Sequence, residues 1–176
     1  DPTEAILSTA EEQDINTMLV DFSFLRNNRK LLSLTTCDIV GIRLRKHFEQ
    51  DISQMIISYD KGRHSDLGLE IGHALSSTND SKIRIVRGVV EDPDDEIEVV
   101  NRINDKMLDL DLKKIQFEKV YGGGNIIPEL LKNFKKDKSA LLVLGAGNQS
   151  ESAFSPKTLE IVDKTNKSVI VVRNHR

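Results

Sequence analysis

Short, continuous apolar runs alternate with segments of helical periodicity along nearly the whole chain. Strands that are apolar on both faces are typical of parallel sheets covered by helices on both sides. The alternation therefore predicts an α/β protein built on an open parallel sheet. The runs expected to form strands are 17–20, 38–42, 54–59, 82–89, 114–120, 140–144 and 168–172.

Several of the intervening segments begin with helix start signals. Ser65 can cap a helix because serine oxygens accept hydrogen bonds from the free N–H groups of a first turn. Ser155 can cap another, since Pro156 suits the first helical position. The helices expected in this way cover 66–75, 92–108, 126–134 and 156–162.

Composition restricts the partners of the chain. Its 25 Lys and Arg residues against 28 Asp and Glu give a net charge of −3, so nucleic acid is not an expected partner. The single cysteine, Cys37, excludes an internal disulfide and is expected to be a small buried hydrophobe. No apolar run approaches the roughly 20 residues that cross a bilayer.

The chain repeats part of itself. Residues 18–20 align with 142–144 at an offset of 124, and residues 39–43 align with 169–173 at an offset of 130. Residues 1–45 are therefore expected to be the last third of a unit that residues 46–176 contain whole. The complete unit is expected to hold a five-stranded parallel sheet with helices on both faces.

The two units resemble the universal stress protein family. In the second unit the likeness rests on "MIISYDKGRHSDLGLEIGHALSS", "YGGGNIIPELLKNF" and "LLVLGAGNQSESAFSPKTLEIVDKTNKSVIVVR", and in the first on "DPTEAILSTAEEQDINTMLV" and "TTCDIVGIR". The resemblance implies a Rossmann-like sheet. Tandem units of this family occur as free stress proteins and as cytoplasmic tails of membrane transporters.

Nucleotide-binding members of the family carry Gly-x-x-Gly, nine residues and then Gly-Ser or Gly-Thr after the fourth strand. Glycines let backbone N–H groups approach phosphate oxygens. Here Gly145 matches the first glycine, Asn148 replaces the second with Gly147 adjacent, and Ser155 with Pro156 replaces Gly-Ser. Pro156 has no N–H to donate. The pattern predicts a degenerate cradle in the second unit and none in the first, whose corresponding segment lacks glycine.

Asp60 keeps two interpretations open. It follows the first strand of the second unit, at the carboxyl edge where open α/β sheets bind ligands, and it matches an acidic residue that the family places against adenosine. It is equally consistent with a polar turn after a buried strand. The candidate nucleotide-binding residues are thus Asp60, Gly145, Gly147 and Ser155.

No catalytic or metal-binding arrangement is expected. The four histidines lack the spacing of zinc ligands, and His64 is interpreted as a solvated loop residue. No nucleophile elbow, redox cysteine pair or calcium-loop pattern occurs in the sequence. We therefore expect no enzyme activity, no metal and no cofactor. The four histidines are His47, His64, His73 and His175.

The function expected from the resemblance is a non-catalytic regulatory and assembly domain on the cytoplasmic side of a membrane transporter, similar to a cation-chloride cotransporter. Its expected partners are the membrane-embedded transport domain of the same polypeptide and a second copy in a homodimer. The alternative is a soluble tandem stress protein or sensor that binds ATP, AMP or a cyclic dinucleotide.

Two surfaces are expected to make contacts. The closing strands of the two units are apolar enough to be poor exposed edges, and they are expected to pair antiparallel, within the chain or between chains. The basic residues Arg26, Arg29 and Lys30 are a candidate contact for an acidic partner or a solvated helix face. The interface residues expected in the closing strands are Ile39, Val40, Ile42, Val169 and Val171.

Overall fold

The computed structural model describes residues 2–46, 52–60, 62–89, 93–112, 115–122, 125–137, 140–147 and 154–175. Helices and strands alternate along most of it, as the sequence predicts. In chain order the elements are α1 (Pro2–Glu12), β1 (Thr17–Asp21), α2 (Phe22–Asn27), α3 (Arg29–Leu34), β2 (Asp38–Arg43), β3 (Gln54–Ser58), α4 (Arg63–Asn79), β4 (Lys82–Val89), α5 (Pro93–Asp109), β5 (Ile115–Tyr121), α6 (Ile127–Phe134), β6 (Ala140–Gly145), α7 (Pro156–Lys164) and β7 (Ser168–Arg173).

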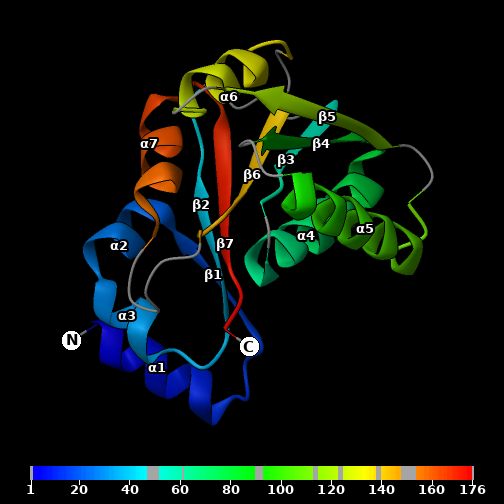
Figure 1. The fold of residues 1–176 in the computed structure, drawn as a ribbon. Helices are drawn as coiled ribbons and strands as arrows, with labels where there is room; N and C mark the ends of the chain where they lie inside the picture. The colour runs from blue at the N-terminus through cyan, green and yellow to red at the C-terminus, as the bar shows by residue number, and fades with distance from the viewer. Residues whose placement is uncertain are drawn as a thin grey trace.

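The strands form one seven-stranded sheet in the order β1-β2-β7-β6-β3-β4-β5 (Figure 1). Residues 46–176 contribute the five parallel strands from β7 to β5, and residues 1–45 add two more, β1 and β2, which are parallel to each other. The α/β class predicted from the sequence is confirmed. The sheet is larger than five strands because both units share it.

The two groups of strands meet at an antiparallel pair, β2 and β7. Val40 lies opposite Val172, and Ile42 lies opposite Ile170. The antiparallel pairing expected of the closing strands thus occurs within one chain. Each strand covers what would otherwise be the apolar edge of the other.

Hydrogen bonds on the two sides of this pair repeat at the same offset of 130 residues. The His175 N–H donates to Asp38 Oδ1 at 2.8 Å, and the Arg45 N–H donates to Ser168 Oγ at 3.0 Å. The turns before the two strands repeat as well: Cys37 N–H donates to Thr35 Oγ1, and Lys167 N–H donates to Thr165 Oγ1. The weak sequence repeat is therefore a structural repeat about the β2–β7 pair.

Helices on both faces of the sheet bury two apolar cores (Figure 1). Side chains of α2, α3, α6 and α7 form the core on one face, with α1 packed against it, and those of α4 and α5 form the core on the other. Cys37 is buried, as expected from the sequence.

The start of α4 differs from the sequence prediction. Gly62 takes the N-cap position with φ of 121°, a conformation that favours glycine, so the helix begins at Arg63. Ser65 is therefore in the first turn and does not cap the helix; its Oγ accepts the Asp60 N–H at 3.0 Å. His64 is a helical residue for the same reason.

Arg43, at the end of β2, fastens the first unit to the last helix of the second. Its guanidinium donates to the carbonyl oxygens of Val162, Thr165 and Lys167, the last at 3.1 Å. These carbonyls lie at and beyond the C-terminal end of α7, where a helix leaves acceptors unpaired and attracts positive charge. Arg43 therefore acts as a cationic cap supplied from the other unit.

Replacing Arg43 by Ala should lower the free energy of unfolding by about 2 kcal/mol, because three partly buried carbonyls lose a charged donor. Urea denaturation followed by circular dichroism measures the change. Arg29→Ala is the matched control, since Arg29 is exposed on α3, and it should stay within about 0.5 kcal/mol of the original chain. Equal stability of the two variants would contradict the capping role.

Candidate functional site

The four candidate residues lie together at the carboxyl edge of the sheet. Asp60 follows β3, Gly145 ends β6, Gly147 follows it, and Ser155 precedes α7; all four line one small cavity. The cavity lies between the ends of β3 and β6, where the strand order reverses. This is the place at which open α/β sheets bind ligands.

The described part of this cavity is too small for a nucleotide. Its volume is about 40 Å³, whereas pockets for small organic ligands span roughly 300 to 1,000 Å³.

Ser155 fills the position at which a phosphate cradle would be open. Its N–H donates to Ala146 O at 2.8 Å, and its Oγ accepts the Thr158 N–H at 3.0 Å, which makes it the N-cap of α7. Gly147 has φ of 85°, and a Cβ there would lie 2.4 Å from Ser155. Pro156 has no N–H. The Thr158 and Leu159 N–H groups in the first turn of α7 donate to Ser155.

Asp60 is held by cations from two neighbouring elements. Lys157 Nζ on α7 lies 3.2 Å from one carboxylate oxygen, and Arg87 Nη1 on β4 lies 3.8 Å from the other. The Asp60 side chain is 60% exposed, so these pairs stabilise the fold only weakly. Lys157 also lines the cavity, so the Lys157–Asp60 pair belongs to its wall.

His64 is part of the framework rather than a solvated loop residue. It is half-buried in α4, and its Nδ1 accepts the Asn174 N–H at 3.0 Å. Burial lowers the pKa of His64, and the nearby Arg63 and Arg173 lower it further. The imidazole is therefore neutral at pH 7, as an accepting Nδ1 requires.

The position in the first unit that corresponds to Gly145 carries a helix cap. Asp21 stands where Gly145 stands in the second unit, by the offset of 124, and its carboxylate accepts the Phe24 N–H at 3.0 Å as the N-cap of α2. The Phe22 ring packs against the Phe154 ring with centroids 5.1 Å apart. Side chains of both units thus pack against each other next to β1 and α7.

A cluster of polar side chains that the sequence did not predict lies beside the site, on the opposite face of the sheet from α7. The buried Tyr59 hydroxyl donates to Asp66, which also accepts from Arg102 Nε at 3.0 Å. Burial, together with this hydrogen bond to Asp66, raises the pKa of Tyr59 above its ordinary value. The group fastens the end of β3 to α4 and α5. Asp66 and Arg102 are 36 residues apart in the sequence, so no local pattern marks this contact.

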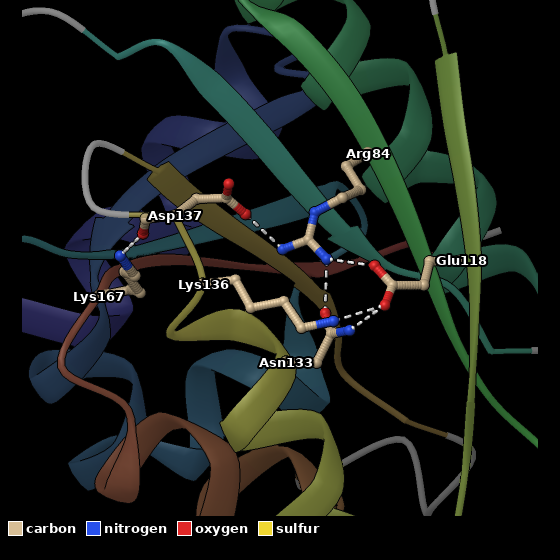
Figure 2. A network of polar contacts seen from close by, with 6 residues as sticks. All are labelled: Arg84, Glu118, Asn133, Lys136, Asp137 and Lys167. Carbon is tan, nitrogen blue, oxygen red and sulfur yellow. Dashed lines mark hydrogen bonds and ion pairs between the residues drawn. The ribbon is translucent and has the colours of Figure 1, made fainter.

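A second unpredicted cluster surrounds Arg84 at the amino end of the strands (Figure 2). The buried guanidinium donates to Glu118 at 2.8 Å, to Asn133 at 2.6 Å and to Asp137 at 2.6 Å. Lys136 also donates to Glu118, at 2.8 Å. The cluster joins β4, β5 and the C-terminal end of α6, far from the candidate site, and we interpret it as structural.

Glu118→Gln should make stability less dependent on pH. Hydrogen bonds from Lys136 and Arg84 lower the pKa of Glu118 against an opposing effect of burial. A carboxylate with a lowered pKa stabilises the fold above its unfolded pKa, and that contribution is lost as the pH falls through the folded pKa. The stability difference between the original chain and Glu118→Gln should therefore be largest at pH 6 and shrink toward about pH 3.

Urea denaturation at pH 6, 4.5 and 3 gives this difference. Glu11→Gln, at an exposed residue of α1, is the control for the loss of one carboxylate. A difference for Glu118→Gln that does not change with pH would contradict the ion pairing.

The remaining motifs give no chemistry in the described part of the chain. Its His, Cys, Asp and Glu residues include no group of three that could hold a metal ion. Among the described helices, none has the length and apolar character to span a membrane. Arg26 and Lys30 are paired with Asp163 and Glu4, so these two cations already have acidic partners within the chain. His47 and Asn148 lie outside the described residues.

Comparison with solved structures identifies the fold. A universal stress protein from Archaeoglobus fulgidus DSM 4304 superimposes with a TM-score of 0.68 at 12% identity, covering 99% of this chain and 66% of that one. A universal stress protein from Archaeoglobus fulgidus in complex with dAMP gives 0.57 at 12%, over 70% of this chain and 100% of that one. A universal stress protein in complex with cAMP gives 0.55 at 13%, over 71% and 99%.

The chain thus has the universal stress protein fold, and it spans about two thirds of the longest of these three matches. No protein-family model matches the sequence, and no curated protein matches it. At identities of 12% to 13%, these similarities show the fold alone.

Proposed function

We propose that the chain is a non-catalytic regulatory and assembly domain of universal stress protein fold whose nucleotide site is filled by its own side chains. The observation that carries the proposal is the packing of Ser155 against Gly147, with Lys157 paired to Asp60 across the same cavity. Asp60 and Ser155, two of the candidate ligand-binding residues, thus already have partners within the chain. A domain of this kind acts through surfaces that contact one state of a partner better than another.

The finer proposal concerns the partner. Residues 1–45 are the last third of a first unit and residues 46–176 a complete second unit, and together they form the cytoplasmic portion of a membrane transporter similar to a cation-chloride cotransporter. The sequence resemblance and the loss of the cradle in both units support this assignment. A homodimer belongs to the proposal too; because β2 and β7 pair within the chain, its interface lies outside these strands.

Calorimetric titration with ATP, AMP, cAMP and a cyclic dinucleotide should give no saturable heat, because the described cavity holds about 40 Å³. The titration is run on the original chain, on Asp60→Ala and on Lys164→Ala. Lys164 lies on the same helix as Lys157 but pairs with Glu160, away from the cavity, which makes its replacement a matched control.

Binding in the original chain and in Lys164→Ala, with at least tenfold loss in Asp60→Ala, would overturn the proposal of a filled site. Binding that survives Asp60→Ala would do the same and would place the ligand elsewhere.

Membrane fractionation tests the transporter assignment. The full-length gene product, tagged at its C-terminus, should sediment with membranes and resist extraction by alkaline carbonate, because the proposed transport domain is embedded in the bilayer. Recovery in the soluble fraction would contradict the assignment and leave the regulatory role without this partner.

A second candidate function is nucleotide sensing, and one observation favours it. Asp60, Gly145, Gly147 and Ser155 converge on one cavity at the ligand-binding edge, and structures with the same fold have been solved in complex with cAMP and dAMP. The titration above separates the two candidates.

A further inference from the structure

One face of β1 and the end of β2 carries apolar side chains that no described helix covers. Leu19 is 67% exposed, Ile42 is partly exposed, and Leu44, just after β2, is 59% exposed. Helices α1 to α3 pack on the other face of these strands, where Met18 and Val20 point. Leu19 lies beside Val40 in the register, on the face that α4 covers farther along the sheet.

The repeat shows what covers the equivalent surface in the second unit. Leu19 corresponds to Val143 by the offset of 124, and Ile42 corresponds to Val172 by the offset of 130. Val143 and Val172 are fully buried under α4, and a Cβ at Gly68 would lie 3.5 Å from the first and 3.4 Å from the second. A glycine thus lets this helix approach both strands closely.

The polar contacts of α4 have matching groups on the uncovered surface. The Asn174 N–H, which donates to His64 of α4, corresponds to the N–H of Leu44. Gly145, whose Cβ would lie 3.4 Å from the Ser65 nitrogen in the first turn, corresponds to Asp21. The Asp21 carboxylate itself is the N-cap of α2, so the match at this place is one of backbone position.

We propose that the surface formed by Leu19, Ile42 and Leu44 binds an amphipathic helix that resembles α4 and places a small residue over Leu19 and Ile42. In the proposed assignment, residues 1–45 are only the last third of the first unit, and the helix comes from the rest of that unit in the same polypeptide. The inference therefore rests on that assignment. A second copy of residues 1–176 cannot supply it, because its own α4 is packed against β3, β6 and β7. A Cβ at position 145 would lie 3.2 Å from His64 Cβ, which is a tight contact. Asp21 has a Cβ where Gly145 has none. The incoming helix therefore lies a few tenths of an ångström farther from Asp21 than α4 does from Gly145.

The test joins a copy of residues 62–80, the α4 sequence, to the N-terminus of the 176-residue chain through a flexible linker of about 20 residues. Tethering raises the effective concentration to the millimolar range, which offsets the weak helicity of a free peptide. We expect Tm to rise by roughly 3 °C. The Leu44 amide should exchange its hydrogen at least tenfold more slowly, since it gains an acceptor.

Two variants make the result specific. Leu19→Glu on the surface, and Gly68→Leu in the fused copy only, should each abolish both effects. Leu108→Glu, at a residue of α5 that is 79% exposed, is the matched control and should keep them. Unchanged Tm and unchanged exchange at Leu44 in the fusion, or effects that survive Leu19→Glu, would overturn the proposal. Nucleotide titration reports on the second-unit cavity, so failure of the filled-site proposal and failure of this one are distinguishable.

Discussion

The antiparallel pairing of β2 with β7 is the constraint on which the rest of the structure depends. Within the described residues, β2 joins β1 to the five parallel strands of the second unit through its pairing with β7. The second unit in turn ends in β7, whose six residues are all buried and whose edge would be open without β2. Each unit therefore covers the most apolar edge of the other, and Arg43 reinforces the junction by capping α7.

The same junction brings aromatic side chains of both units together beside the candidate site. Antiparallel pairing brings the covering helices of both units onto one face, where Phe22 meets Phe154. Phe154 is buried immediately before Ser155, and Ser155 packs on Gly147.

The sequence predicted the elements well and the polar clusters poorly, for a physical reason. Strands buried on both faces leave continuous apolar runs, so β4 and β7 were placed within one residue. The convergence of Asp60 with Gly145 followed from the rule that parallel strands present their carboxyl ends at one edge. The Arg84 cluster could not be foreseen, since its partners come from separate segments that only the folded sheet brings together.

The exposed Leu19 gives a scale for the proposed regulatory role. Burying a leucine contributes roughly 1.5 to 3 kcal/mol, which corresponds to a factor of about 10 to 150 in an equilibrium constant. A partner that covers Leu19 in only one of its states can shift that equilibrium by up to this factor, whereas a partner that covers it equally in both states shifts nothing. A helix held permanently on this face therefore stabilises the fold, and one that docks and leaves regulates. The two roles differ in whether the contact is the same in every state of the full-length protein.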